Sequence, residues 1–321
     1  MGDKSVWDQE IAVPAAVIEY IDKGVKDKLP EGTQCHGITP SGASYWARTA
    51  KIDATNEHGE NTYLLHQGKD MASSEFEAMK LLRKVMPELV AEPIGWGLYL
   101  ERPDTWFYLC RYCELSGDLP SLSKFPELLA EMHRWSAASP SAMGQGDLFG
   151  LDLVTYGGRN PHSFPPSPSW EEAFTRGLQK TFDMEEATQS PDTEMRRLLQ
   201  SMMTKVVPRL LRPLETETEG IAVTPTLVHG DLWDGNISVD VDTGGPVIFD
   251  ATPLYAHHEY GLTPWWATRY KMAGAYIDEY TKCCPVSEPK EDFADRGVLY
   301  GLRSDLNASS LYSSNLMDRN M

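Results

Sequence analysis

Apolar and polar residues alternate over two neighbouring stretches near the start of the chain. Residues 45–52 (YWARTAKI) and 62–66 (TYLLH) have the period of two that is typical of half-buried strands, and NEHGE between them has the composition of a turn. We therefore expect two adjacent strands there. The preceding TPSGAS, residues 39–44, is rich in small residues and is expected to be a loop.

The next stretch has the period of a helix. In SSEFEAMKLLRKVM, residues 73–86, apolar side chains recur every three or four positions. They are Phe76, Met79, Leu82 and Val85 or Met86. Ser74 is expected to cap this helix, with Glu77 completing a capping box three residues later, and Pro87 is expected to end it.

Residues 95–112 are rich in aromatic residues and are expected to form a hairpin around the turn Arg102-Pro103-Asp104. Together with the strands and the helix before it, this hairpin would complete a small α/β lobe over residues 1–113. The polar, turn-rich CELSGDLPSL that follows is expected to be a hinge between two lobes.

Beyond residue 113 the periodicity is mainly helical. Helices are expected over residues 125–137, 169–184, 192–214 and approximately 290–312. The Pro/Gly/Ser-rich residues 157–169 are expected to be a surface loop, and the short apolar runs 226–228 and 246–249 to pair as a small hairpin. The sequence thus predicts an α+β, bilobal fold. Its small β-rich N-terminal lobe is followed by a larger, mainly helical C-terminal lobe over residues 114–321.

The polar segment HGDLWDGN, residues 229–236, lies between the two short apolar runs. Protein kinases place a proton-accepting Asp and a metal-binding Asn at the spacing found here between Asp231 and Asn236, and a second metal-binding Asp after the next strand pair. Asp250 ends the apolar PVIFD at the corresponding position. The alternative is a tight Asp234-Gly235 turn among solvated acids, but a turn explains neither this spacing nor Asp250. The motif therefore predicts phosphoryl transfer.

Charge and cysteine content limit the possible partners and the compartment. A formal charge of −18 argues against a nucleic-acid or anionic-membrane surface. No run approaches the ~18 apolar residues of a membrane span, and the N-terminal MGDKSVWDQE lacks the apolar core of a secretory signal. The five cysteines are scattered, and the CxxC spacing of Cys110 and Cys113 has no second ligand pair at a zinc-site distance. We expect buried thiols and a cytoplasmic, reducing location.

The segments LVHGDLWDGN and GPVIFDATPLYAHHEYGL resemble the fructosamine-3-kinase (ketosamine-3-kinase) family, which includes protein-ribulosamine 3-kinases. The similarity runs from about residue 45 to residue 312, and the C-terminal part resembles fungal members. The resemblance implies a protein-kinase-like fold of the aminoglycoside phosphotransferase type, with ATP and Mg²⁺ as cofactors. It also implies phosphorylation of the 3-hydroxyl of ribulosamine or fructosamine adducts, on glycated proteins or small ketosamines, which leads to protein deglycation.

The resemblance also implies roles for individual residues. Asp231 is the expected general base, and Asn236 and Asp250 are the expected Mg²⁺ ligands. His229 is expected to brace the loop through a side-chain hydrogen bond. Residues expected near the sugar, or in support of the metal-binding loop, are Trp233, His257 and Glu259. For His257 and its neighbour His258, a packed or solvated pair is the equally acceptable alternative.

The nucleotide side departs from the family pattern at one position. The strand lysine that holds the α- and β-phosphates is replaced by His66, which is mostly neutral at pH 7. Lys51 on the neighbouring strand, or Lys69, could supply the missing charge, and Glu75 is the expected helix partner. Backbone groups around Gly42 and Ser44 are expected to cover the phosphates. The backbone of residues 110–114 is expected to meet adenine, and this segment includes Cys110, Tyr112 and Glu114.

Two other functions stay open at this point. A kinase for a small amino alcohol or an aminoglycoside would suit the acidic chain, although Trp233 and the segment YAHHEY favour a ketosamine. A pseudokinase, which binds nucleotide or protein without turnover, would explain His66 but not the intact Asp231, Asn236 and Asp250.

Overall fold

The structure, a computed structural model, describes residues 19–43, 47–56, 59–68, 71–138, 146–215 and 222–311. These residues fall into two compact units. Unit 1 comprises the chain up to Gly117 together with Val239–Asp250, and unit 2 comprises Asp118–Ser238 and the chain from Ala251 onward. The functional division between residues 113 and 114 stays a prediction, because compactness alone does not assign a role to either unit.

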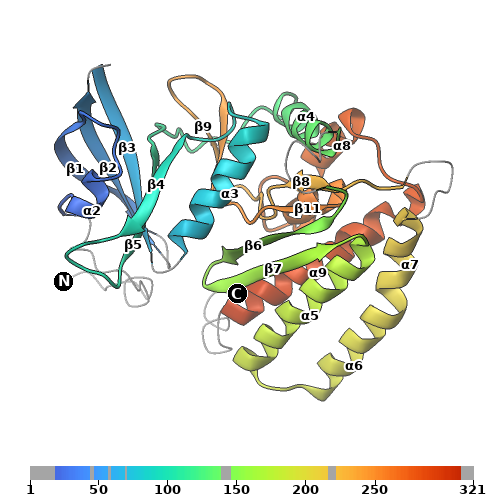
Figure 1. Ribbon diagram of the computed structural model, residues 1–321. Coiled ribbons are helices and arrows are strands. Elements are labelled where there is room, and N and C mark those ends of the chain that lie inside the picture. Colours follow the sequence, from blue (N-terminus) through green and yellow to red (C-terminus); the bar gives the residue numbers. More distant parts are fainter. Residues whose placement is uncertain are drawn as a thin grey trace, which may run out of the picture. The chain divides into compact units, whose positions relative to one another are not determined.

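Unit 1 is built on an antiparallel five-stranded sheet with the order β1-β2-β3-β5-β4 (Figure 1). Its strands are β1 (Gln34–Ala43), β2 (Arg48–Asn56), β3 (Gly59–Gly68), β4 (Pro93–Leu98) and β5 (Trp106–Arg111). The short helix α2 (Lys23–Lys26) precedes the sheet, and α3 (Ala72–Val85) packs against β4 and β5. On β2, the alternate residues Ala50, Ile52 and Ala54 are buried, as the period of a half-buried strand requires.

Two expectations for unit 1 were wrong in detail. Residues 39–43 of the expected loop belong to the end of β1, where a register shift lies between Pro40 and Gly42. Helix α3 begins at Ala72, and its N-cap residue Met71 makes no side-chain cap. The Met71 carbonyl already accepts the Glu75 N–H at 3.0 Å, so Ser74 lies inside the helix and does not cap it.

Unit 2 combines a four-stranded sheet of order β7-β6-β11-β8 with most of the helices (Figure 1). The strands are β6 (Phe149–Gly157), β7 (Asn160–Ser167), β8 (Thr226–Val228) and β11 (Leu254–Ala256). The α-helices are α4 (Phe125–Ala138), α5 (Trp170–Gln189), α6 (Thr193–Ser201), α7 (Val207–Leu211), α8 (Gly274–Cys283) and α9 (Phe293–Leu311). A π-helical turn (Met202–Val206) separates α6 from α7, and 3-10 segments cover Arg212–Glu215, His258–Trp266 and Lys290–Asp292. None of the helices described is long and apolar enough to cross a membrane.

Two expectations for the sheets were also wrong. Most of residues 157–169 form β7, in which Asn160, His162 and Phe164 alternate with more exposed positions. The prolines are tolerated because β7 is an edge strand of its sheet. The apolar run 226–228 forms β8, which pairs with β11 (Leu254 opposite Val228), whereas β10 (Pro246–Ile248) pairs with β9 (Ile237–Val239).

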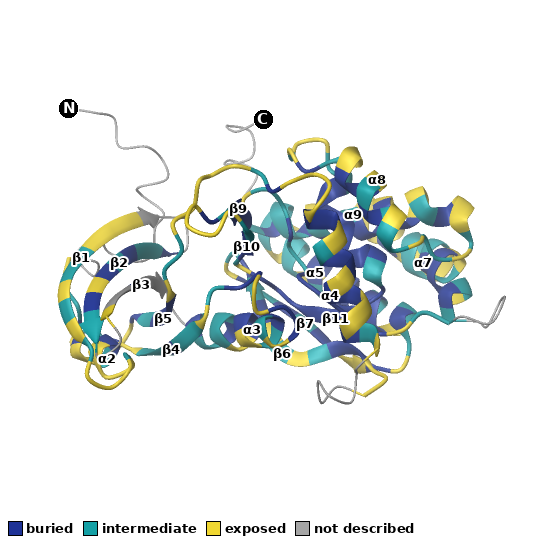
Figure 2. Ribbon diagram, turned by 90° about the horizontal axis from the view of Figure 1, so that it is seen from above, coloured by how far each residue is buried: buried dark blue, intermediate teal, exposed yellow. Residues whose placement is uncertain are grey.

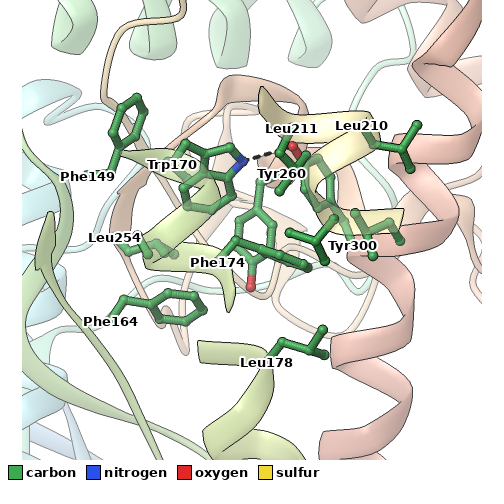
Figure 3. Close-up of a cluster of buried hydrophobic side chains, with 14 of the residues drawn as sticks. Phe149, Phe164, Trp170, Phe174, Leu178, Leu210, Leu211, Leu254, Tyr260 and Tyr300 are labelled. Atoms are coloured by element: carbon green, nitrogen blue, oxygen red, sulfur yellow. Dashed lines mark hydrogen bonds between the residues drawn. The ribbon is translucent and has the colours of Figure 1, made fainter. Parts of the chain in front are cut away.

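Aromatic side chains form the centre of unit 2 (Figure 3). Trp170 and Phe174 of α5 contact Tyr300 of α9, with ring centroids 6.0 and 5.3 Å away, and Trp170 Nε1 donates to the Tyr300 hydroxyl at 2.9 Å. Tyr260 packs edge-to-face on the same rings. In Figure 2, β11 is correspondingly coloured as buried along its length. This core holds α5 and α9 against the sheet.

A buried ion pair lies beside this aromatic core. Arg296 Nε donates to Glu259 Oε2 at 2.7 Å and Arg296 Nη2 to Glu259 Oε1 at 2.9 Å, and both side chains are almost fully buried. The remaining Arg296 donors reach the carbonyls of Ser287 and Pro289. Both carboxylate oxygens of Glu259 and all three guanidinium nitrogens of Arg296 are thus hydrogen-bonded. These bonds offset the free-energy cost of removing the two charges from water.

Four histidines in unit 2 have pKa values far below the usual value; His133, His162 and His257 are buried, and His258 is half-buried. Burial lowers the pKa of His133, His162 and His258 to about 3. The pKa of His257 also lies well below its usual value, because of burial and the nearby Arg296 charge. Folding therefore places uncharged imidazoles among apolar neighbours.

We predict that Arg296→Met lowers the free energy of unfolding by about 3–5 kcal/mol, because it leaves the Glu259 carboxylate buried without its partner. Urea denaturation of the variant measures this loss. The matched control is Arg269→Met, since Arg269 pairs with Asp305 at 3.0 Å on the surface and should cost about 1 kcal/mol or less. If both variants lost the same free energy of unfolding, the stabilising role of the buried Glu259–Arg296 pair would be contradicted.

We also predict that stability falls as the pH is lowered from about 6.5 toward 3. The unfolded histidines, with a pKa of 6.5, take up protons that the folded ones, with a pKa of about 3, do not. Each contributes up to about 1.4 kcal/mol per pH unit in this window. Urea midpoints measured across the range should show this slope, and His133→Phe should reduce it. A flat profile would exclude neutral buried histidines.

Candidate functional site

The segment after β8 forms a tight loop in unit 2. Gly230 adopts φ +82°, and a Cβ there would lie 2.0 Å from the Thr252 carbonyl oxygen, so only glycine fits. The Thr252 N–H donates to the His229 carbonyl at 3.0 Å and ties the loop to the chain before β11. His229 is buried, and its Nδ1 accepts the Asp231 N–H at 3.3 Å, the bracing bond expected from the sequence.

Asp231 and Asn236 are hydrogen-bonded to each other. Asn236 Nδ2 donates to the Asp231 carbonyl at 2.8 Å and to the carboxylate Oδ2 at 3.2 Å. Asn236 is buried, whereas Asp231 is half-buried at the surface of the loop. The arrangement orients a carboxylate toward solvent and fixes which atom of the Asn236 amide faces it. Such a carboxylate can accept a proton from an incoming hydroxyl.

Trp233 projects from the same loop and packs against Tyr270, with ring centroids 5.2 Å apart. The Trp233 indole packs against Gly235, and a Cβ at position 235 would lie only 2.1 Å from the ring. Asp234 accepts the Lys271 N–H at 3.0 Å. The Asp234-Gly235 pair therefore makes the bend and leaves room for an aromatic ring beside Asp231.

Unit 1 contains a cavity of about 520 Å³. Its walls come from the sheet, α3, the segment after β5 and the chain around β10. Residues lining it include Thr49, Glu75, Tyr108, Cys110, Glu114 and Asp250. This volume falls within the range of small-molecule sites.

The predicted adenine-contacting segment, residues 110–114, lies along this cavity. Burial raises the pKa of the Cys110 thiol, and Glu75 adds to the effect. The pKa of Tyr112 is raised to about 12 by burial and by its 2.7 Å hydrogen bond to Glu114. The Cys110 thiol and the Tyr112 hydroxyl are therefore uncharged at neutral pH.

Asp250 ends the apolar stretch after β10 and also lines this cavity. Its φ of +54° lies in the left-handed region, which a non-glycine residue adopts at a cost. Backbone strain of this kind is concentrated at functional sites. Asp250 belongs to unit 1, whereas Asp231 and Asn236 belong to unit 2, so the predicted site residues fall into two groups, one in each unit.

The predicted phosphate-binding positions lie on the sheet of unit 1. Gly42 pairs with Thr49 near the end of β1, and Ser44 and Lys69 lie outside the described residues. The backbone of His66 pairs with Thr49 on one side and Tyr108 on the other, both of which line the cavity. Position 66 therefore lies between two cavity-lining strands.

Lys51 lies two residues beyond Thr49, on the same face of β2. Its Nζ stands 4.9 Å from the centre of the Tyr112 ring and 3.9 Å from Asp53. Lys51 thus contacts Tyr112, which lines the cavity, but is not itself one of the lining residues. Glu75, the expected partner of the phosphate-binding cation, also lines the cavity.

His257 and Glu259 lie inside unit 2. His257 Nδ1 is 3.0 Å from the Tyr300 hydroxyl and its Nε2 is 2.9 Å from Ser287 Oγ. Glu259 is held by Arg296, as described above. These contacts give both residues a part in the packing of unit 2, and a role for them beside the sugar stays a prediction. Together with His258 they form a His-His-Glu group whose candidate ligand atoms lie within 4.8 Å of one another, but the contacts of His257 and Glu259 already use those atoms.

Several cavity residues were not anticipated from the sequence. Thr49 and Met79 line the cavity of unit 1, as do Val247, Ile248 and Phe249 before Asp250. The last three directly precede the predicted site residue Asp250, and this proximity in sequence could have indicated them. Thr49 and Met79 carry no local signal and are found only from the fold.

Comparison with known proteins places these features in a family. Residues 50–321 match the fructosamine kinase family. A ketosamine-3-kinase of Mus musculus is 38% identical over 117 residues, which are 36% of this chain and 34% of the mouse protein. A chloroplastic protein-ribulosamine 3-kinase of Oryza sativa subsp. indica is 30% identical over 208 residues, 65% of this chain and 55% of the rice protein. The chain thus spans between about a third and just over half of the length of these relatives.

Solved structures show the same fold at low sequence identity. A protein assigned as a fructosamine-3-kinase from Haemophilus somnus 129PT gives a TM-score of 0.65 at 16% identity over 90% of both chains. Its counterpart from Thermobifida fusca gives 0.62 at 17% identity, over 87% of this chain and 95% of the other. A thermostable aminoglycoside phosphotransferase gives 0.52 at 17% identity over 89% of each chain. The predicted α+β, protein-kinase-like fold of the aminoglycoside phosphotransferase type is confirmed.

The family match covers most of the chain and includes the HGDLWDGN loop, Asp250 and the residues from Glu75 onward that line the cavity of unit 1. It agrees with the resemblance on which the sequence prediction rested. The chain belongs to the fructosamine kinase family.

Proposed function

We propose that this protein is an ATP-dependent kinase that phosphorylates the 3-hydroxyl of ketosamines. Its acceptors would be ribulosamine or fructosamine adducts, on protein lysines or as small molecules. The observation that carries the proposal is the Asp231–Asn236 pair at the end of β8, in which the amide of one holds the carboxylate of the other. The names of the mouse and rice relatives support the ketosamine substrate class.

Asp231 is the proposed general base. The attacking hydroxyl would give its proton to the Asp231 carboxylate as its oxygen forms a bond to the γ-phosphorus of ATP. The bond between that phosphorus and the β,γ-bridging oxygen breaks, and ADP leaves. The hydrogen bond from Asn236 Nδ2 keeps the carboxylate in place while it takes up the proton.

The oxygen donors of this chain suit Mg²⁺. Asn236 and Asp250 offer amide and carboxylate oxygens, the ligand types that Mg²⁺ prefers. Because Asn236 directs its Nδ2 toward Asp231, its Oδ1 is the atom that would bind the ion. When bound, Mg²⁺ would neutralise charge on the phosphates. The lining of the cavity includes three carboxylates (Glu75, Glu114 and Asp250) and one guanidinium (Arg111), and carboxylate oxygens suit a divalent cation.

The cavity of unit 1 is the proposed nucleotide site. Adenine would lie against the backbone of residues 110–114, with Tyr108 as an apolar wall. Backbone N–H groups near Gly42 and Ser44 would cover the phosphates. Lys51 or His66, with Glu75, would complete the phosphate contacts. A solved aminoglycoside phosphotransferase of this fold binds AMP-PNP, which supports ATP as the donor.

Trp233 would form an aromatic wall for the sugar, with His257 and Glu259 acting from inside unit 2. Five free thiols in the described chain suit a reducing cytoplasm.

Of the alternative functions, the pseudokinase has a specific observation in its favour. Position 66 lies between two cavity-lining strands and carries histidine.

We predict that Asp231→Asn lowers kcat by about 10³-fold or more, because the amide cannot accept the proton. The amide oxygen can still accept from Asn236 Nδ2, so the thermal midpoint should not change. ADP release with a fructosyl adduct of N-acetyllysine measures kcat. Asp242→Asn, at an exposed turn position, is the control and should behave as wild type. Turnover that survives in Asp231→Asn would refute the assigned role.

We predict that His66→Lys lowers the KM for ATP by about ten-fold, because a full positive charge replaces a mostly neutral ring on a strand that lies between two cavity-lining strands. Steady-state kinetics with varied ATP tests this. Lys51→Met is the companion variant. If Lys51→Met abolishes ATP binding and His66→Lys gains nothing, the phosphate contact belongs to Lys51. If wild type shows no thermal stabilisation by millimolar Mg-ATP, the kinase proposal itself is wrong.

A further inference from the structure

A small hollow in unit 2 borders the loop that carries Asp231. Its volume of about 10 Å³ leaves room for one water-sized group. Thr252, which lines it, donates its N–H to the His229 carbonyl, and the Thr252 carbonyl lies against Gly230. Tyr260 also lines the hollow, and its pKa is raised by burial and further by the Asp231 carboxylate. The hollow and the proposed catalytic base are therefore neighbours within one unit.

Arg303 lines this hollow and carries an unsatisfied donor. It lies on α9 and is only 3% exposed. Its Nη1 donates to the Tyr260 hydroxyl at 2.9 Å, and its guanidinium carbon lies 4.7 Å from the centre of the Phe164 ring. Its Nε is buried and makes no hydrogen bond in the described part of the chain. A buried donor on a charged group is costly to leave without a partner.

His162 supplies an unsatisfied acceptor. It lies on β7, is 7% exposed, and burial and the Arg303 charge lower its pKa to about 3, so the ring is neutral. His162 Nε2 lies 3.1 Å from Asn307 Oδ1, which also accepts from Asn160 Nδ2 at 3.0 Å. Nε2 therefore carries the proton, and Nδ1 has the lone pair. Nδ1 is buried without a partner among the described residues.

Both groups are held in place by the fold. A Cβ at Gly157 would lie 2.4 Å from His162 Cε1, so glycine on β6 makes the space that the imidazole occupies. Phe164 fits against Gly177 in the same way, with 2.2 Å from a Cβ there to the ring. The donor and the acceptor thus come from a packed helix and a packed strand, which suits a site of fixed geometry.

A hydroxyl group matches this hollow in size and in hydrogen bonding. Its oxygen can accept from Arg303 Nε, and its proton can go to His162 Nδ1. A carboxylate would meet the lone pair of Nδ1, and an ammonium group would meet the Arg303 charge. A water molecule has the same complementarity as a hydroxyl and is the occupant to expect without substrate.

We propose that this hollow receives one hydroxyl of the sugar acceptor, other than the one phosphorylated, and that Arg303 and His162 thereby select among acceptors. The inference rests on the proposed function, in which the acceptor is a polyhydroxylated ketosamine. A site built to hydrogen-bond a hydroxyl rejects an analogue that lacks it, because its buried polar groups are then left without partners.

The test uses the fructosyl adduct of N-acetyllysine and its 4-deoxy, 5-deoxy and 6-deoxy analogues. Kinetics are measured on wild type, Arg303→Met, Arg303→Lys and His162→Phe. If Arg303→Met folds poorly, Arg303→Lys replaces it in the test, because lysine keeps the buried positive charge. His133→Phe is the matched control, since His133 is equally buried and neutral but does not line the hollow. Calorimetric titration of Asp231→Asn, alone and combined with Arg303→Lys, gives binding without turnover.

We expect wild type to discriminate by about ten-fold in kcat/KM against one deoxy analogue, mainly through KM. In the Arg303 and His162 variants, kcat/KM for the unmodified fructosyl adduct should no longer exceed kcat/KM for that deoxy analogue. The His133→Phe variant should keep the difference. Turnover with equal discrimination in all variants overturns this inference and leaves the proposed function standing. Binding that shows the discrimination without any turnover overturns the proposed function alone. No binding of any adduct, or a crystal structure with bound adduct and only water in the hollow, also overturns the inference.

Discussion

The close approach of Gly230 to the Thr252 carbonyl determines the geometry of the candidate catalytic loop. A side chain at position 230 would collide with that carbonyl, and φ of +82° already favours glycine. Because the chain can pass this close, the Thr252 N–H reaches the His229 carbonyl and the segment after β8 is tied to the one before β11. Asp231 follows directly and is held by Asn236 five residues later. The same contact brings the wall of the small hollow beside the proposed base.

The interior of unit 2 is organised so that this loop rests on a rigid support. The buried charges of Glu259 and Arg296 pair with each other, and the buried His133, His162 and His257 are neutral. Aromatic contacts between Trp170, Phe174 and Tyr300 hold α5 and α9 together (Figure 3). Buried polar atoms without a partner in the described chain occur on His133, His162, Tyr255, His258 and Arg303, and of these residues only Arg303 and His162 line the hollow. Unsatisfied groups that line one hollow are candidates for ligand contacts.

The sequence predicted the features that depend on local spacing. The Asp231–Asn236 loop and the helical periodicity of α3 and α9 follow from residues close together in the chain, as does the family. Long-range pairing could not be read in this way. β8 pairs with β11 across some 25 residues, and the prolines of β7 hide its alternation because an edge strand tolerates them. The cavity of unit 1 is assembled from positions as distant as Thr49 and Asp250, and the hollow from His162 and Arg303. No local pattern connects such residues.

The central claim is that this chain transfers the γ-phosphoryl group of ATP to the 3-hydroxyl of a ketosamine. Phosphorus NMR of a reaction with Mg-ATP and the ribulosyl or fructosyl adduct of N-acetyllysine tests it most directly. The account predicts a new phosphate-ester signal coupled to the proton on C3, formed in equal amount with ADP. Inorganic phosphate with no sugar ester, an ester at another hydroxyl, or no loss of ATP would contradict it.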